Sequence, residues 1–566
     1  MDNFRLILIM IWVFLGLLLY QAWEQDYGKK PTDVRNSQPV ASSTSPATPP
    51  QEAVATPGTV TPESLEADAS MPTIETPTAE LPTAQVDRII KTNSRVSVET
   101  DVFKVEIDTL GGDVRRIDLL NYPVEATTPD IPFRLMNDEL PQFFIAQSGF
   151  LGTPLAPSHQ VTYQAAHNSY QLSSDENTLE VKLVWENQGV RVNKIYTFER
   201  GSYIIGLKYV VENHTSEPWK ARLYGQFQRT GVTTSKESRF IYTYTGGAIS
   251  SPENRYEKIK FNDITDDFLK KEKRAGWKEG WVGMLQHYFV AAWIPDSQQV
   301  YDYYSKPLTE GRYMLGMYGP TQLVPPGTQQ SFDLRLYVGP KLQDELADIA
   351  PGLDLTVDYG WLWFLAQPLF WVLKYVHGIV QNWGWSIIIL TLLIKLAFFH
   401  LSATSYKSMA NMRRLQPRLM ALKDRYGTDK AKLQQAMMDL YRKEKINPLS
   451  GCLPILVQIP VFISLYWVLL ESVELRQAPF ILWLTDLSSP DPYFVLPLVM
   501  GVTMLLQHKL NPAPIDPVQQ KVMMILPIVF TVFFAFFPAG LVLYWTVNNM
   551  LSITQQWVIT KSIVKD

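Results

Sequence analysis

Residues 385–403 form an apolar run, WSIIILTLLIKLAFFHLSA, that is long enough to cross a lipid bilayer and carries a lysine, Lys395, near its middle. An α-helix needs about 20 predominantly apolar residues to span the ~30 Å hydrocarbon core of a membrane. Five further runs have the same character, at 1–23, 451–470, 493–508, 522–537 and 540–560. We therefore predict a polytopic α-helical membrane protein with six transmembrane helices, two of them short enough to indicate a locally thinned bilayer.

The N-terminal segment, residues 1–23, has a short basic start followed by the uncharged run LILIMIWVFLGLLLYQAW. A cleaved signal peptide has the same order of regions, but the long apolar run and the lack of a small-x-small cleavage site favour an uncleaved signal anchor. Residues 24–88 are rich in Pro, Thr, Ala, Ser and Glu. Such a composition cannot bury enough apolar surface to fold, so we predict a disordered linker.

Residues 89–340 consist of short segments in which apolar and polar residues alternate, such as VFKVEID, LEVKLVW and YIIGLKYVVEN. Turn sequences such as LGGD and ENQG separate these segments, as is typical of consecutive β-strands. The pattern predicts one large β-sandwich domain. A single helix is expected within it, near 252–273.

Residues 341–384 are rich in aromatic side chains and include an interior proline in GWLWFLAQPLFWVLKYVHGIV. Aromatic residues concentrate where a membrane meets water, so we predict an amphipathic helix that lies at this interface. A further, proline-kinked transmembrane helix is the alternative.

The charges of the loops give an orientation. Residues 404–450 carry 11 basic and 4 acidic side chains, a net charge of 11 − 4 = +7, whereas residues 471–492 carry 1 basic and 4 acidic side chains, a net charge of −3. Because positively charged loops stay in the cytoplasm, 404–450 is expected inside and 471–492 outside. Counting along the chain places both termini, the loop 509–521 and the short tail 561–566 in the cytoplasm. Residues 24–384 are then on the outer side, which in a bacterium is the periplasm.

The cytoplasmic segment 404–450 has leucine and methionine at helical spacing on both sides of a turn at Gly427-Thr428-Asp429. This pattern predicts two amphipathic helices that form an antiparallel hairpin. Its basic surface suits ribosomal RNA, anionic headgroups or a partner protein, although the charges also serve to set the topology. The candidate contact residues are Arg413, Arg414, Arg418, Lys423, Arg425 and Lys430.

Lys395 lies about eight residues from the cytoplasmic end of its helix, which is ~12 Å at the helical rise per residue. A charge at this depth costs at least ~2.5 kcal/mol unless it faces protein or water. The five other predicted spans contain no Asp or Glu away from their ends, which removes a buried ion pair as the explanation. We therefore expect Lys395 to face a water-filled space.

Polar side chains in other spans support an aqueous groove in the inner half of the membrane. Thr391 lies one turn before Lys395, and the last span carries a polar stripe at i, i+3, i+7 and i+10. Helix–helix hydrogen bonding is the alternative role for each of these groups. The candidate groove residues are Lys395, Thr391, Gln458, Gln507, Trp545, Asn548, Ser552 and Gln555.

Several functional classes lack support in the sequence. The spans contain no Ser/His/Asp grouping, no paired carboxylates and no set of metal ligands, so we expect neither an enzyme nor a cofactor. Cys452 is the only cysteine, which excludes an intrachain disulfide. A solute transporter remains the main alternative, and it predicts inverted repeats and broken helices that the sequence does not display. A membrane-tethered glycan-active enzyme is a second alternative, based on the β-domain.

Five stretches resemble the YidC/Oxa/Alb family of membrane protein insertases: NWGWSIIILTLLIK, SYKSMANMRRLQPRL, NPLSGCLPILVQIPVF, SVELRQAPFILWLTDLSSPDPY and FPAGLVLYWTVNN. The resemblance is dense over residues 360–560. The anchor, linker and outer β-domain are similar to the long form found in Gram-negative bacteria. The resemblance implies a five-helix insertase core and a β-domain with a supersandwich fold.

The resemblance also implies a function: an inner-membrane insertase and chaperone that inserts, folds and helps assemble membrane proteins, alone or with the Sec translocon and its accessory subunits. Nascent chains, lipids and the ribosome are the implied partners, and DNA is not. Lys395 occupies the position of the family's groove charge, where many relatives have arginine, and Thr391 also matches a groove position. Tyr544 and Trp545 match an aromatic pair that contacts entering segments. The chain's C-terminal tail is short compared with many relatives, so ribosome contact would depend mainly on 404–450.

Overall fold

The computed structural model describes nine ranges of the chain: 92–152, 154–232, 243–251, 254–264, 278–295, 299–427, 429–444, 453–511 and 517–565. The predicted signal anchor at 1–23 and the predicted linker at 24–88 lie outside these residues. The chain divides into two compact units, one made of 1–67 with 418–445 and the other of 68–417 with 446–566. The β-domain and the helical bundle discussed below belong to the second unit.

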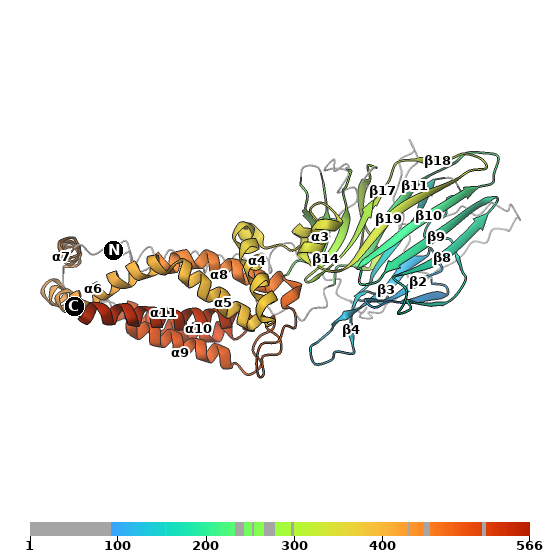
Figure 1. The fold of residues 1–566 in the computed structure, drawn as a ribbon. Coiled ribbons are helices and arrows are strands. Elements are labelled where there is room, and N and C mark those ends of the chain that lie inside the picture. Colours follow the sequence, from blue (N-terminus) through green and yellow to red (C-terminus); the bar gives the residue numbers. More distant parts are fainter. Residues whose placement is uncertain are drawn as a thin grey trace, which may run out of the picture. The chain divides into compact units, whose positions relative to one another are not determined.

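Within the described residues, the β-domain contains two sheets of ten and nine strands (Figure 1). The path of the first is β16 (Asp302–Pro307), β17 (Arg312–Tyr318), β11 (Trp219–Thr230), β5 (Phe144–Gly152), β3 (Asp113–Pro123), β2 (Phe103–Asp108), β1 (Arg95–Glu99) and β7 (Ser169–Gln171). Off this path, β4 (Pro132–Met136) pairs with β3 and β18 (Gln322–Val324) pairs with β11. β1 and β7 are parallel, and the other pairs in this sheet are antiparallel.

The second sheet is antiparallel throughout. Its order is β13 (Glu257–Ile259), β12 (Gly246–Ile249), β14 (Val282–Gln286), β15 (Phe289–Pro295), β19 (Gln329–Pro340), β10 (Ile204–Asn213), β9 (Val190–Glu199), β8 (Thr178–Asn187) and β6 (Gln164–Ala165). Two short 3₁₀ turns, Phe261–Asp263 and Thr309–Gly311, connect strands. The helix expected near 252–273 is wrong for the described part, which forms β13 and the first of these turns.

The two sheets pack face to face. Every second residue of β10 is buried, as the alternation in its sequence requires. Trp293 of the second sheet packs on Gly225 of the first, where a Cβ atom would approach the indole to 2.9 Å. The indole Nε1 donates a hydrogen bond to the Gln226 carbonyl at 3.1 Å. These contacts make the β-domain a sandwich with one continuous apolar core.

The segment 341–384 forms two helices rather than the single helix predicted. They are α3 (Gln343–Ile349) and α4 (Trp363–Val380), with 3₁₀ turns at Asp354–Thr356 and Gly360–Leu362 between them. Gly352 and Gly360 have φ values of 80° and 66°, a left-handed conformation that interrupts a helix. α4 does present the predicted aromatic face, with exposed Trp363, Phe364, Trp371, Tyr375 and Ile379.

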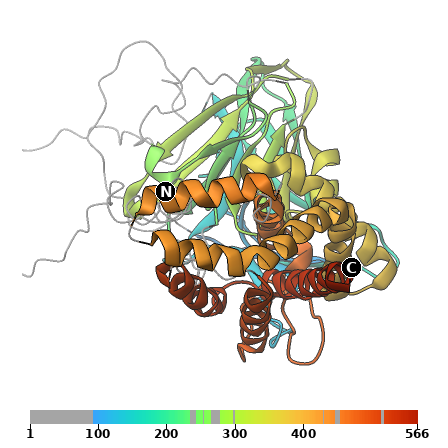
Figure 2. The same ribbon diagram turned by 90° about the vertical axis from the view of Figure 1, so that its left-hand side faces the viewer.

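Helices α5 (Trp383–Ala397), α6 (Phe399–Tyr426), α8 (Leu453–Glu471), α9 (Val495–Leu510), α10 (Pro517–Phe534) and α11 (Ala539–Lys565) follow. α11, the red helix in Figure 2, packs against α5, α8 and α9, while α4 packs against α5 and α8. α10 packs against α9. α11 continues almost to the C-terminus, so the predicted separate tail at 561–566 is helical as far as Lys565.

Among the described residues, no single helix has both the length and the apolar character needed to cross a membrane. The pair α5 and α6 meets that test together, with a bend of 68° between them. The run 385–403 was predicted as one helix, and this is wrong. The Phe398 N–H still donates to the Ile394 carbonyl, but the backbone of Phe398 leaves the helical conformation, and α6 starts at the next residue. Three shorter apolar helices are present at Leu456–Glu471, Val495–Leu510 and Gln520–Phe534.

In the segment 404–450, α7 (Lys430–Lys443) follows α6 after a turn. Asp429 is the N-cap of α7, and its carboxylate accepts a hydrogen bond from the Lys432 N–H at 3.1 Å. Two helices therefore lie on either side of this turn, as the sequence pattern predicts.

Candidate functional site

The end of α5 positions Lys395. Asn382 caps the start of this helix by accepting a hydrogen bond from the Trp385 N–H at 3.1 Å. Lys395 lies in the last turn before the break at Phe398. The unpaired carbonyls at a helix C-terminus carry partial negative charge, which favours a cation there. The bend therefore places the ammonium group where the backbone itself stabilises it.

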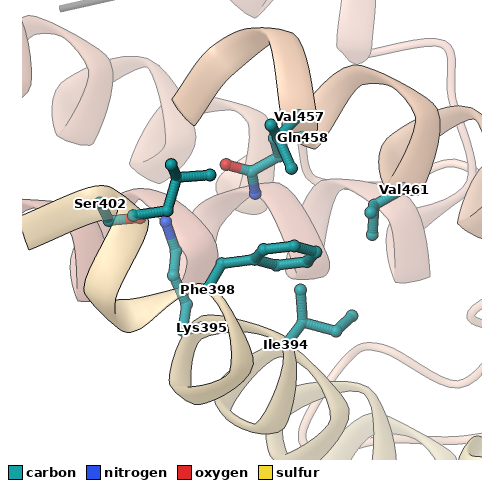
Figure 3. A pocket seen from close by; sticks show the side chains of 8 residues that line it. Ile394, Lys395, Phe398, Ser402, Val457, Gln458 and Val461 are labelled. Carbon is teal, nitrogen blue, oxygen red and sulfur yellow. The ribbon is translucent and has the colours of Figure 1, made fainter. Parts of the chain in front are cut away.

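Lys395 lines a small, partly open pocket between α5, the first turn of α6, and α8. Figure 3 shows the Lys395 ammonium and the Gln458 amide pointing into the same space from opposite helices, with the ring of Phe398 beside them. The complete lining is Ile394, Lys395, Phe398, Leu401, Ser402, Val457, Gln458 and Val461. The pocket thus combines one cation and one amide with a largely apolar wall.

A chain of hydrogen bonds connects the pocket to α11. The Lys395 Nζ donates to the Ser552 Oγ at 2.7 Å, and this hydroxyl donates in turn to the Asn548 carbonyl at 2.7 Å. The Gln458 Nε2 donates to the Asn548 side-chain oxygen and to the Tyr544 hydroxyl at 3.2 Å. The structure therefore brings together five of the predicted groove residues, from three helices. No carboxylate of the described residues is within ion-pair distance of Lys395, as the sequence indicated.

Four other predicted groove residues have different surroundings. The Thr391 hydroxyl is buried and donates to the Ile387 carbonyl of its own helix at 2.6 Å. Trp545 packs edge-on against Phe462, with ring centroids 4.7 Å apart. Gln555 donates to the Phe399 carbonyl at 3.3 Å, next to the bend. Gln507 is partly exposed on α9.

A second polar face of α11 was missed from the sequence. Asn549 donates to the Thr503 hydroxyl at 3.3 Å, and Gln556 donates to the Leu510 carbonyl at 3.3 Å and the Asn511 side chain at 3.1 Å. Both residues are buried against α9. Their separation of seven residues, two helical turns, was the signal that could have identified this face.

The hairpin residues form a mostly exposed basic surface. Arg413, Arg414 and Arg425 are exposed, and Lys423 is half-buried. Arg418 forms an ion pair of 2.7 Å with Glu444 near the end of α7. The side chain of Lys430 lies outside the described part of the structure.

Comparisons with known proteins agree with this architecture. The family model described as YidC periplasmic domain matches residues 95–372, and the model described as 60Kd inner membrane protein matches residues 375–566. The chain is 50% identical to "Membrane protein insertase YidC" of Thioalkalivibrio sulfidiphilus over 578 residues, covering 100% of this chain and 99% of the relative. It is also 50% identical to the protein of the same name from Methylococcus capsulatus over 569 residues, with the same coverage.

A crystal structure titled as an active YidC insertase with its first transmembrane domain resolved is similar, at 19% identity and a TM-score of 0.38, covering 82% of this chain and 93% of that one. The fold and the matches along the whole chain define a helical membrane protein with a large β-sandwich domain. The family follows from the relatives at 50% identity. This chain belongs to the YidC family of membrane protein insertases.

Proposed function

We propose that the chain inserts and folds membrane proteins, and that the pocket around Lys395 is the point at which an entering segment leaves water. The observation that carries this proposal is the Lys395 ammonium, held at the end of α5 by a hydroxyl rather than a carboxylate. Its positive charge is therefore not neutralised by an ion pair with the described residues. It is available to an acidic group of a substrate that must cross to the other side of the membrane.

In this proposal six helices span the membrane, counting the N-terminal run at 1–23, and the hairpin and both termini are cytoplasmic. The pocket then lies in the inner half of the bilayer. It shortens the apolar distance that polar residues of the substrate must cross, and this lowers the barrier to their transfer. The β-domain lies in the periplasm.

Exposed apolar side chains on α8 and α11 offer a route into lipid. On α8, Leu456 and Ile459 are exposed, and on α11 Met550, Trp557 and Val558 are exposed. No GxxxxGK[ST] phosphate-binding sequence occurs in the chain. The free energy of insertion comes from partitioning, at roughly 0.8 kcal/mol per buried CH₂ group.

The proposed partners are nascent membrane proteins, the ribosome, the Sec translocon with its accessory subunits, and lipids. The exposed arginines of the hairpin support contact with an anionic partner such as ribosomal RNA, because a clustered positive surface attracts polyanions.

The test is insertion of a single-span substrate with an acidic N-terminal segment by Lys395→Ala, Lys395→Arg and Lys395→Glu variants. We expect the Lys395→Arg variant to retain insertion, Lys395→Ala to reduce it and Lys395→Glu to reduce it most. A substrate with a neutral segment is the matched control and should depend less on the charge. Equal insertion by all three variants would contradict the proposal.

A further inference from the structure

Arg476, in the loop between α8 and α9, connects the helical bundle to the β-domain. Its Nη2 donates to the carbonyls of Pro123 at 2.6 Å and Val124 at 3.2 Å, at the end of β3. The adjacent Gln477 donates through its Nε2 to the same two carbonyls, both at 3.1 Å. Two neighbouring side chains of the loop therefore bind one point on the β-domain.

The guanidinium group also lies over two aromatic rings of the β-domain. Its central carbon is 5.8 Å from the centroid of Phe133 and 5.7 Å from that of Phe289. These two rings are themselves stacked, with centroids 4.4 Å apart. A planar cation over aromatic faces gains from the ring quadrupoles, and it combines this with a forked set of hydrogen-bond donors that lysine lacks.

One further hydrogen bond and one electrostatic interaction connect the β-domain to the end of α8. The Nε2 of His287, in the turn between β14 and β15, donates to the Leu470 carbonyl at 2.8 Å. Burial lowers the pKa of His287 to about 3, so this imidazole is neutral at ordinary pH. Lys341, directly after β19, and Glu471, the last residue of α8, are both buried. Burial lowers the pKa of Lys341 to about 8, and the charge of the Glu471 carboxylate opposes this shift.

The other side of the same loop holds the start of α11. The carbonyl of Leu487 accepts a hydrogen bond from the Gly540 N–H at 2.9 Å, and that of Ser489 accepts one from the Ala539 N–H at 2.8 Å. The Asp486 carboxylate accepts from the Gln477 N–H at 3.1 Å and from the Ser488 N–H at 2.8 Å. Asp486 thereby connects the two halves of the loop.

α11 carries Ser552, the hydrogen-bond partner of Lys395, and α8 carries Gln458, which lines the same pocket. We propose that the loop 472–494 is a coupling element, in which Arg476 fixes the β-domain to the bundle and thereby holds the outer ends of α8 and α11 in the position that aligns the pocket. Arg476 is then a positioning residue for insertion. The coupling to insertion rests on the proposed function, whereas the fixed orientation of the β-domain does not.

The experiment measures orientation and helix stability separately from insertion. In full-length protein with Cys452→Ser, spin labels are attached at Lys182→Cys on β8 and Leu498→Cys on α9, both exposed positions. The distance distribution should be narrow, and Arg476→Gln should broaden it. Hydrogen exchange at the start of α11 should rise about tenfold, the size expected for losing a charged hydrogen bond, while exchange in α10 stays unchanged.

Arg200→Gln is the matched control, because Arg200 donates to the carbonyls of Ser173 at 2.7 Å and Glu176 at 2.8 Å entirely within the β-domain. Gln477→Ala is a milder variant that should broaden the distribution less than Arg476→Gln. It also keeps the test usable where Arg476→Gln fails to fold. Lys395→Ala should leave the distances unchanged even where it abolishes insertion, which separates the two proposals.

An unchanged distance distribution in both Arg476→Gln and Gln477→Ala would overturn the fixed orientation. A broadened distribution without faster exchange in α11 would overturn the coupling to the pocket. Broadening, faster exchange and reduced insertion in Arg476→Gln, with none of these in Arg200→Gln, would support the whole proposal.

Discussion

Glu474, in the loop 472–494 between α8 and α9, makes the stability of the protein depend on pH. This residue lies in the 3₁₀ turn Val473–Leu475, and burial raises the pKa of its carboxyl from 4.5 to about 7. Lys374 of α4 opposes the shift, whereas Asp344 and Glu345 of α3 reinforce it. The folded protein therefore retains a proton between pH 4.5 and 7 that the unfolded chain releases.

The sign follows from this difference in bound protons. The contribution of Glu474 to the free energy of unfolding is greatest below pH 4.5. It decreases as the pH rises through the folded-state pKa, by up to about 1.4 kcal/mol per pH unit. Integrated from pH 5.5 to pH 8 with the two pKa values, the contribution of this residue falls by about 2 kcal/mol. Glu474→Gln replaces the carboxyl by a neutral amide of the same shape, so its contribution should not change over this range.

The assay is denaturant unfolding of the purified protein in detergent, followed by tryptophan fluorescence at pH 5.5 and pH 8. We expect the free energy of unfolding to fall by about 2 kcal/mol more in the wild type than in Glu474→Gln when the pH is raised from 5.5 to 8. Lys374→Met is a useful companion, because removal of the opposing cation should raise the pKa of Glu474 further and extend the loss to higher pH. Identical pH dependence of wild type and Glu474→Gln would refute the reasoning.

Two further predictions concern the sheet packing and the pocket. Gly225→Ala places a methyl group 2.9 Å from the Trp293 ring, so it should lower the free energy of unfolding by about 1–3 kcal/mol. The control Gly378→Ala adds a methyl group with no atom within 4 Å and should be neutral or stabilising. Ser552→Ala removes the acceptor for the Lys395 ammonium, so insertion of a substrate with an acidic segment should fall between wild type and Lys395→Ala. Ser552→Thr, which keeps a hydroxyl, should restore most of it; equal insertion by the Ala and Thr variants would contradict the role of the hydroxyl.

The strands and most helices could be predicted because their signals are local. Alternation in YIIGLKYVVEN corresponds directly to the buried and exposed residues of β10. The pairing of these strands into two sheets could not be predicted in the same way, because the order depends on contacts between distant segments. β11, for example, pairs with β5, β17 and β18.

The pocket was predicted in part for a similar reason. Lys395 and Ser552 are identifiable because each is a polar residue in an apolar span. The spacing of Ser552 from Asn548 also shows which face of the last span it occupies. Phe398 and Ser402 line the same pocket, yet they give no such signal, because their place depends on the bend between α5 and α6. Pro417, Pro460 and Pro527 lie inside α6, α8 and α10 without ending them, whereas the bend occurs where the sequence has neither proline nor glycine. Local propensity therefore points to the wrong positions for a break.

The bend also changes how the position of Lys395 should be understood. A straight helix over 385–403 would leave Lys395 ~12 Å from the helix end at Ala403, too far for the side chain to reach water easily. Because α6 turns by 68°, each residue after Phe398 advances along the axis of α5 by only about a third of the normal rise. Lys395 is then about 3 Å from the end of α5, beside the Ser552 hydroxyl and the helix carbonyls. The helix therefore ends close to Lys395, and its free carbonyls favour a cation at that position.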